Sequence, residues 1–331
     1  PTARGGSISS AEAINGIIKR CMAEQVSKKR ILILLSAYNG EKYIGEQLDS
    51  LLALGGDFEF TVRVRDDGSS DSTPAILAAY GRERGVEVIN GENVGFNASF
   101  FALMEGAEET YDYYALCDQD DVWLPGKFER AVPMLEKENA AQPLLYSGVL
   151  CLTGEDLKEK RTLPYPKRGP SFYNAMIQDI CSGHTMVFNA ALLRLLKGSY
   201  REGLMNYDHW IYLAASAFGK VIYDSEPQVL YRQHGENAVG AQDGFFKKTA
   251  RRLRYLKQAR GGAMARQLAA FYEAFGGSLR EEYRREISDF LASGKNFCSR
   301  IKYACKSRAV RQSGAETLLF RLLYVFGKVG S

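Results

Sequence analysis

Short apolar runs alternate with stretches of helical periodicity through about the first third of the chain. The run 31–35 is typical of a strand buried on both faces of a parallel sheet. In 41–54 the apolar residues recur at helical spacing instead. The predicted elements are a strand at 31–35, a helix at 41–54, a strand at 58–64, a helix at 75–80, a strand at 86–89, a helix at 97–105 and a strand at 113–117. This alternation predicts an α/β fold with a doubly wound, mostly parallel sheet.

Polar loops follow the predicted strands, and the most informative is Asp118-Gln119-Asp120-Asp121. The carboxyl ends of parallel strands share one edge of the sheet, where open α/β sheets bind their ligands. Clustered carboxylates bind a hard cation such as Mg²⁺ or Mn²⁺, which keeps water and phosphate oxygens as further ligands. The sequence therefore predicts a site for a metal ion and a diphosphate. It has no Gly-x-Gly-x-x-Gly or Gly-Lys-Ser/Thr loop, which argues against a dehydrogenase or a P-loop enzyme.

The rest of the chain is less regular and then becomes helical. Strands are predicted at 144–150, 185–188, 221–223 and 229–231. We expect these strands to form a smaller mixed sheet on the acceptor side. The predicted units are an N-terminal extension at 1–29, a nucleotide-sugar-binding half at 30–140, an acceptor-binding half at 141–240 and a basic helical region at 241–331.

Composition is ordinary for a globular protein, with 46% hydrophobic and 25% charged residues in 331. No apolar run approaches the ~18 residues of a membrane span, and the N-terminus lacks the apolar stretch of a signal peptide. We therefore expect a cytoplasmic protein. The six cysteines are scattered without metal-binding spacing and are expected to be reduced and structural.

The charge is distributed unevenly along the chain. Residues 245–331 contain 19 Lys and Arg against 6 Asp and Glu, whereas the preceding residues contain 24 against 33. Within this basic region, 245–257 alternates basic and apolar residues, as an amphipathic helix on an anionic membrane does. A helix packed on the catalytic domain has the same pattern, so both alternatives stay open. Nucleic-acid binding is not expected, because it leaves the acidic motifs unexplained.

Several motifs together resemble the inverting glycosyltransferases of family 2, which have the GT-A fold. The resemblance covers roughly residues 30–240. The motifs that carry it are Ser36-Ala37-Tyr38-Asn39-Gly40, Asp66-Asp67-Gly68-Ser69-Ser70-Asp71, Asn93-Val94-Gly95, Asp118-Gln119-Asp120-Asp121-Val122-Trp123, Asp208-His209-Trp210 and Tyr231-Arg232-Gln233-His234. Their order and spacing are more specific than any one of them.

The resemblance implies a donor site for a nucleotide sugar with a divalent cation, Mg²⁺ or Mn²⁺. Asp120 and His234 are the implied metal ligands. The implied nucleotide-sugar contacts are Ser36, Tyr38, Asn39, Asp67, Asn93, Asp118 and Arg232. Two alternatives stay open here. Asp66 and Asp67 also suit a helix N-cap, and Arg232 also suits a structural salt bridge.

On the acceptor side, the resemblance implies that Asp208 is the catalytic base, which takes a proton from the attacking hydroxyl group. The alternative for Asp208 is a helix N-cap. His184, His209 and Trp210 are the implied acceptor contacts, and Gly183 permits a close approach of the backbone to a ligand. A histidine that is satisfied by polar neighbours is an equal alternative for His184.

Within the family, the motifs look most like bacterial rhamnosyltransferases of cell-wall, capsule or O-antigen polysaccharide synthesis. The implied donor is dTDP-L-rhamnose, and the implied acceptor is a saccharide or a lipid-linked saccharide on the inner face of the plasma membrane. UDP-galactose or a UDP-hexosamine stays open as the donor. A sugar-nucleotide pyrophosphorylase is the rival enzyme, although the loop after the first strand lacks the basic residues that such an enzyme needs.

Overall fold

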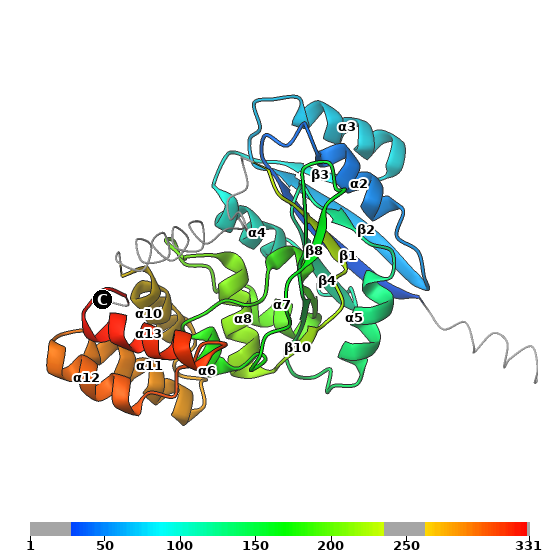
Figure 1. The fold of residues 1–331 in the computed structure, drawn as a ribbon. Helices are drawn as coiled ribbons and strands as arrows, with labels where there is room; N and C mark the ends of the chain where they lie inside the picture. The colour runs from blue at the N-terminus through cyan, green and yellow to red at the C-terminus, as the bar shows by residue number, and fades with distance from the viewer. Residues whose placement is uncertain (1–27, 235–261, 330–331) are drawn as a thin grey trace, which may run out of the picture.

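The computed structural model describes residues 28–234 and 262–329. Most of the predicted N-terminal extension and the whole basic segment 245–257 lie outside the described residues. Within these ranges the chain forms a large sheet, a smaller second sheet and a group of C-terminal helices (Figure 1). No helix in the described ranges has both the length and the apolar character that a membrane span requires.

The large sheet has seven strands in the order β10-β6-β9-β4-β1-β2-β3. Their bounds are β1 Lys29–Ala37, β2 Phe58–Asp66, β3 Glu87–Asn90, β4 Tyr113–Cys117, β6 Leu144–Gly148, β9 Val187–Asn189 and β10 Lys220–Asp224. Only β9 runs antiparallel to its neighbours, β4 and β6. The predicted doubly wound, mostly parallel sheet is therefore confirmed. β1, β2 and β4 end at the edge where open sheets of this kind bind ligands.

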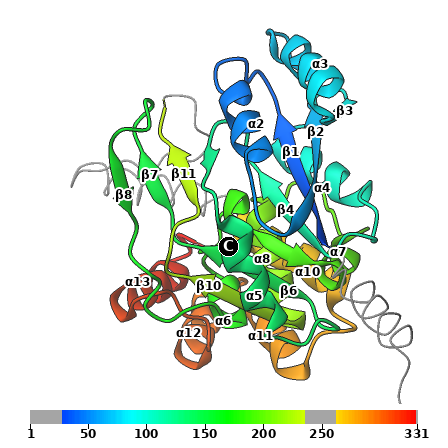
Figure 2. The ribbon, with the colours of Figure 1, turned by 90° about the vertical axis from the view of Figure 1, so that its right-hand side faces the viewer.

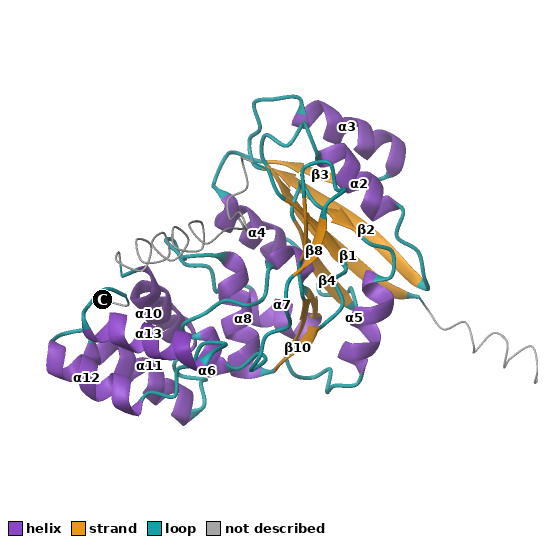
Figure 3. Cartoon of the chain, viewed as in Figure 1, coloured by secondary structure: helices purple, strands orange, loops and turns teal. Residues whose placement is uncertain are grey.

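Helices cover both faces of this sheet (Figure 3). Alternate residues of β1 point to opposite faces, as the two-residue period of a strand requires. Ile31 and Ile33 pack with α2, α3 and α5, whereas Leu32 and Leu34 pack with α4, α7 and α8. The bounds of these helices are α2 Ile44–Leu52, α3 Thr73–Arg84, α4 Phe96–Glu105, α5 Lys127–Glu136, α7 Ala190–Leu196 and α8 Tyr207–Phe218. The continuous apolar run of β1 thus belongs to two cores.

The smaller sheet has the order β5-β11-β7-β8 and stands beside the large one (Figure 2). Its strands are β5 Val122–Trp123, β7 Cys151–Thr153, β8 Lys160–Thr162 and β11 Val229–Arg232. The prediction for this part was wrong in one respect. The strands expected at 144–150, 185–188 and 221–223 join the large sheet as β6, β9 and β10, because β9 inserts between β4 and β6.

The C-terminal helices gather at one end of the molecule (Figure 1). They are α10 Ala263–Phe275, α11 Glu281–Ser293, α12 Phe297–Lys306 and α13 Gly314–Val325, and they pack near the short α6 Phe172–Ala175. Phe271 of α10 lies edge-on to Trp210 of α8, and Tyr283 of α11 stacks on Phe172 at 4.0 Å. The described part of the helical region therefore shares one hydrophobic core with residues 141–234.

The cysteines of the described ranges are unpaired thiols. Cys117, Cys151 and Cys181 are buried, whereas Cys298 and Cys305 are exposed on α12. Burial raises the pKa of the Cys117 thiol, which accepts a hydrogen bond from Gln47 at 3.0 Å. The three buried thiols fit the expectation of structural cysteines, whereas the two exposed ones do not.

Candidate active site

The carboxylate loop, residues 118–121, connects the large sheet to the small one, because β4 ends at Cys117 and β5 begins at Val122. Gln119 anchors this loop to the loop after β1. Its amide oxygen accepts from the backbone N–H of Tyr38 at 2.8 Å, and its amide nitrogen donates to the carbonyl of Tyr38 at 3.0 Å. Sequence reasoning gave Gln119 no role, although an amide between carboxylates was a visible signal.

Asp118, Asp121 and His184 form a compact cluster, with one donor atom of each within 4.8 Å of the others. The Nδ1 atom of His184 lies 3.1 Å from Asp118 Oδ2 and 3.6 Å from Asp121 Oδ2. His184 comes from the 3-10 helix η1, Gly183–Thr185, which precedes β9 in the second half of the sheet. The predicted role of His184 is an acceptor contact, and this geometry offers an alternative role as a metal ligand.

Burial controls the protonation of this cluster. It raises the pKa of the Asp121 carboxyl to about 7, since that side chain has no exposed surface. Burial opposes a charge on His184, but the carboxylates of Asp121 and Asp118 outweigh it and raise the pKa of the imidazole. A site with this much negative charge in a buried place is stabilised by any bound cation.

Asp120 and His234, the two predicted metal ligands, are brought together by the small sheet. His234 follows β11, and its Nε2 atom lies 2.8 Å from Asp120 Oδ2. Burial and the Asp118 carboxylate raise the pKa of Asp120, against the opposing effect of His234. The ring of Tyr43 packs on the imidazole with centroids 4.7 Å apart.

These side chains fit a divalent cation. Among the described residues, Asp121 Oδ2 and His184 Nε2 are buried atoms without a hydrogen-bond partner. Orphaned buried groups are rare in proteins, and they point to a missing ligand or water. Carboxylate oxygens with one or two imidazoles suit Mg²⁺ or Mn²⁺. The candidate donors are therefore the cluster of Asp118, Asp121 and His184 and the separate pair of Asp120 and His234.

Lys127 places a buried amine beside the cluster. Its ammonium group donates to the carbonyl of His184 at 2.7 Å and lies 3.6 Å from the ring centre of Trp123. Burial lowers the pKa of Lys127 to about 7. The sequence carried a signal, since Lys127 occupies an apolar position of the amphipathic α5 helix.

The model of glycosyl transferase family 2 matches residues 32–196. The chain belongs to this family. Among the relatives of this family-2 transferase is the dTDP-rhamnosyl transferase RfbG of Shigella flexneri, 26% identical over 229 residues that make up 66% of this chain and 77% of RfbG. An uncharacterized protein of Mycobacterium tuberculosis is 24% identical over 258 residues, or 76% of this chain and 70% of that protein.

Solved structures show the fold of the family-2 transferase independently. TarS residues 1–349 of S. aureus, in complex with UDP-GlcNAc, superposes with a TM-score of 0.53 and 16% identity. The match covers 91% of this chain and 81% of the TarS chain. A second structure of TarS residues 1–349 gives a TM-score of 0.52. The predicted GT-A fold is confirmed by this likeness together with the sheet topology.

Most of the contacts predicted for the donor lie at or after the ends of β1, β2 and β3. Tyr38 is 47% exposed, so its ring is accessible to a ligand. Asn39 has a φ of 47° and accepts from the backbone N–H of Ser70 at 2.8 Å, so it ties the two loops together. Ser36 shares a hydrogen bond of 2.6 Å with Ser99, and Asn93 is exposed.

Asp67 is buried, and its carboxylate is already engaged. It pairs with Arg65 and accepts from the backbone N–H groups of Val94 at 3.1 Å and Gly95 at 2.9 Å. The N-cap alternative for Asp67 is therefore wrong, since the N-cap residue of α3 is Ser72. Asp67 instead holds the loop that carries Asn93 against the end of β2.

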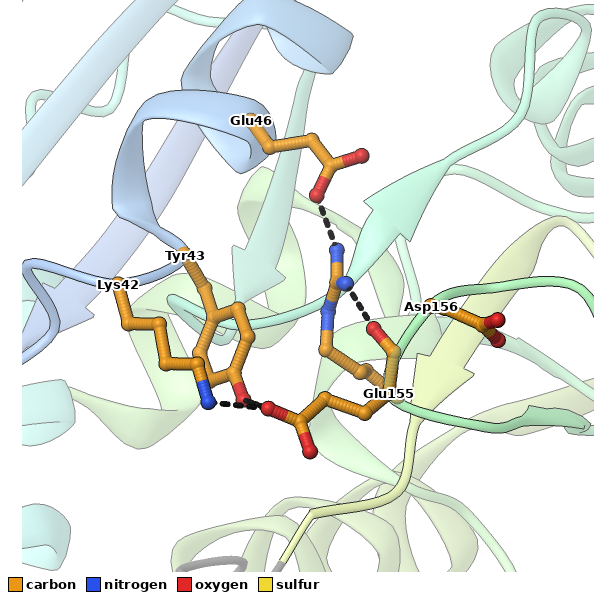
Figure 4. Close-up of a pocket in the computed structure, with 6 residues that line it drawn as sticks. Lys42, Tyr43, Glu46, Glu155 and Asp156 are labelled. Carbon is orange, nitrogen blue, oxygen red and sulfur yellow. Dashed lines mark hydrogen bonds and ion pairs between the residues drawn. The ribbon is translucent and has the colours of Figure 1, made fainter.

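Arg232 forms a structural salt bridge, which was the alternative to a contact with the nucleotide sugar. It is 4% exposed, forms a salt bridge with Glu46, and donates to the carbonyls of Asp120 and Glu155. Arg232 borders an open cavity of about 490 Å³, and Figure 4 labels the other side chains that line it. The cavity is lined by Lys42, Tyr43, Glu46, Glu155, Asp156 and Arg232.

Asp208 lies in the first turn of α8 and is not its N-cap, which is Asn206. Its carboxyl accepts from the backbone N–H of His209 at 2.8 Å. Burial and the neighbouring Asp179 raise the pKa of Asp208 well above its ordinary value. Tyr207, the preceding residue, donates to Asp118 at 3.4 Å, which places the start of α8 beside the carboxylate loop.

His209 and Trp210 do not suit the acceptor contacts predicted for them, because both are buried on the inner side of α8. His209 donates to the carbonyl of Ala175 at 2.6 Å, and burial lowers its pKa. Trp210 has no exposed surface and donates to Ser199 at 3.0 Å. Both side chains attach α8 to its neighbours, so neither is retained as an acceptor contact.

Proposed function

We propose that this glycosyltransferase moves L-rhamnose from dTDP-L-rhamnose to a saccharide or lipid-linked acceptor, with inversion at the anomeric carbon. The observation that carries the proposal is the cluster of Asp118, Asp121 and His184, with Asp120 of the same loop paired to His234, at the carboxyl edge of a GT-A sheet. Similarity to a dTDP-rhamnosyl transferase supports the choice of donor. The TarS complexes with UDP-GlcNAc and with UDP support a nucleotide sugar in general.

A divalent cation bound by these candidate donors would neutralise the charge that develops on the diphosphate leaving group. The protein itself positions these ligands. Gln119 and Arg232 hold the backbone of the carboxylate loop from opposite sides, through Tyr38 and through the carbonyl of Asp120. Pre-organised ligands need no rearrangement when charge develops, which is the main advantage of a fixed electrostatic site.

The transfer itself needs a base on the acceptor side, and we assign that role to Asp208. The acceptor oxygen bonds to the anomeric carbon, and the bond from that carbon to the diphosphate oxygen breaks with its electron pair. The hydroxyl proton passes to the Asp208 carboxylate. A carboxyl group with a raised pKa suits this step, because base catalysis is most effective when the pKa lies near the working pH.

The experiment that tests the proposal is calorimetric titration with dTDP, UDP and GDP, then with dTDP-rhamnose and UDP-hexoses, each with and without Mn²⁺. Metal-dependent binding of dTDP-rhamnose supports the proposal, and Asp120→Ala should abolish it. Asp57→Ala is a matched control, because Asp57 is exposed in the turn before β2, at the opposite end of the strands. A preference for a UDP-sugar would replace the donor, and absence of any nucleotide binding would refute the function.

A lipid-linked acceptor requires contact with a membrane surface, and helices α12 and α13 offer one. Their outer faces expose six large apolar residues, namely Phe297, Ile301, Leu318, Leu319, Leu322 and Phe326. The rings of Phe297 and Phe326 lie 6.1 Å apart, so the two helices share this apolar face. Helix α12 also carries three basic residues and no acidic one. Apolar residues beside cations are typical of surfaces that bind anionic lipids, and we propose that use here.

A further inference from the structure

Tyr43 lies where the large sheet meets the small one, and its ring packs on the imidazole of His234. Tyr43 is the N-cap residue of α2, which covers the large sheet, whereas His234 follows β11 of the small sheet. The two ring centroids lie 4.7 Å apart, and the ring planes are tilted by 36°. Rings at this separation and tilt touch mainly through their faces. Tyr43 is 7% exposed, so this contact lies inside the protein.

Contacts from several elements hold the ring of Tyr43 in place (Figure 4). Its hydroxyl donates to the Glu155 carboxylate at 2.8 Å, and Glu155 lies in the turn between β7 and β8. The ammonium group of Lys42 pairs with the same carboxylate and lies 5.1 Å from the centre of the Tyr43 ring. The Arg232 guanidinium lies 4.8 Å from that centre, within the range of a cation–π contact. The ring is therefore fixed from the start of α2, from the β7–β8 turn and from β11.

The orientation of the His234 imidazole depends on side-chain contacts, because His234 lies beyond the end of β11 at Arg232. An imidazole binds a metal ion through a nitrogen in the plane of its ring, and neighbouring groups set that plane. The Nε2 atom of His234 faces Asp120, at 2.8 Å from Oδ2. A second ring packed on the face of the imidazole fixes the plane without occupying either nitrogen.

We propose that Tyr43 is a positioning residue for the metal site. Its ring holds the imidazole of His234 in the plane that directs Nε2 to the Asp120 carboxylate, where the cation would bind. The inference rests on the proposed function, in which Asp120 and His234 are candidate metal ligands. Groups that orient a metal ligand typically contribute about 10–100-fold to metal affinity.

Binding of Mn²⁺ alone tests the inference, with free Mn²⁺ measured by its EPR signal and no nucleotide present. Tyr43→Leu removes the aromatic ring and should weaken Mn²⁺ binding by about 10–100-fold. Tyr43→Phe keeps the ring and should bind Mn²⁺ nearly as wild type does. Tyr80→Leu is the matched control, because the Tyr80 hydroxyl also bonds to α2, at the carbonyl of Gly45 at 3.1 Å, but from α3. It should lower the melting temperature and leave Mn²⁺ binding unchanged.

A measurement on the wild-type protein covers the case in which Tyr43→Leu does not fold. The chain has three histidines, so few imidazole signals need to be assigned by NMR. A nuclear Overhauser effect between ring protons of His234 and Tyr43 should be present without metal. It should persist when Mg²⁺ is added to the point at which the His234 signals stop shifting. Its loss on addition of Mg²⁺ would overturn the inference, because the imidazole would then leave Tyr43 to bind the metal.

The outcomes separate this inference from the proposed function. Wild-type affinity of Tyr43→Leu for Mn²⁺ would overturn the positioning role. An equal loss of affinity in Tyr43→Phe would also overturn it, because the effect would then belong to the hydroxyl bond with Glu155 and not to the ring. Asp120→Ala tests the metal site itself. If this variant binds Mn²⁺ as wild type does, the metal site of the proposed function fails, whatever Tyr43 does.

Discussion

Replacing Gly183 with alanine would place a methyl group against the hydroxyl of Tyr207. An added Cβ would lie 1.9 Å from that oxygen and 2.4 Å from the ring carbon that bears it. Ordinary contact begins at 3.4 Å, so the ring must move by about 1.5 Å. Tyr207 is fully buried and stacks on Phe100 with centroids 4.0 Å apart, which leaves little room for that movement. Overpacking of this kind costs about 1–3 kcal/mol.

The effect should reach the active site as well as the fold. Gly183 precedes His184 of the carboxylate–imidazole cluster, and Tyr207 precedes Asp208 and contacts Asp118. A displaced ring therefore moves His184, a candidate metal ligand, and the proposed base together. We expect Gly183→Ala to lower kcat as well as the free energy of unfolding, measured by urea titration with tryptophan fluorescence.

A second glycine, Gly45, serves as a control for the Gly183→Ala substitution. Gly45 in α2 also faces a tyrosine hydroxyl, that of Tyr80, but an added Cβ there would lie 3.6 Å away, in ordinary contact. Gly45→Ala should stabilise the protein by about 0.5–1 kcal/mol, because alanine is the better helix former.

The Tyr207→Phe background provides a further check on the clash. Removing the hydroxyl reduces the required ring movement to about 1.0 Å, since the ring carbon would be the nearest atom. Gly183→Ala should therefore cost less stability in this background than in wild type. Equal unfolding free energies for Gly183→Ala and wild type would refute the packing argument, and equal costs in both backgrounds would exclude the hydroxyl as its cause.

Three further substitutions have definite expected results. Asp208→Asn should bind donor normally in calorimetry but lower kcat by about 10²–10⁴-fold, and normal turnover would exclude it as the base. Lys127→Met should remove a pH dependence of stability. Because the pKa of Lys127 is lowered to about 7 in the folded protein, the wild type gains stability as pH rises from about 7 to about 10. The melting temperature of the wild type, relative to that of the variant, should therefore rise over this range. Leu322→Glu with Phe326→Glu should abolish sedimentation with anionic vesicles, whereas Tyr165→Glu, at an exposed aromatic residue outside the C-terminal helices, should not.

The sequence predicted the first half of the fold well, because each buried parallel strand is a continuous apolar run. The strand expected at 113–117 has those bounds in the structure, and those at 31–35 and 58–64 are two or more residues longer. The short strands β7 and β8 were missed, since three residues carry no periodicity and β8 is fully exposed. The insertion of β9 between β4 and β6 depends on contacts far apart in the chain, which no local pattern encodes.

The site was predicted less evenly than the fold. Residues that follow parallel strands were identified because topology brings strand ends together, and Asp120 with His234 do lie in contact. Which residues face the protein core was harder to predict. Trp210 was expected at the acceptor, yet it lies in the core, and Gly183 was expected to approach a ligand, yet it approaches Tyr207. Helical spacing tells which residues share a face, but not which face meets solvent when both sides of a helix are apolar.

The carboxylate loop is also a mechanical joint between the two sheets. On its far side β11 is attached to it through Arg232, whose backbone N–H donates to Asp121 and whose guanidinium donates to the carbonyl of Asp120. The small sheet cannot swing outward without pulling Asp120 away from Asp118 or breaking these bonds. Any ligand that bridges the loop and His234 therefore holds the two sheets together. Its binding should slow amide hydrogen exchange in β5 and β11, including at residues far from the ligand itself.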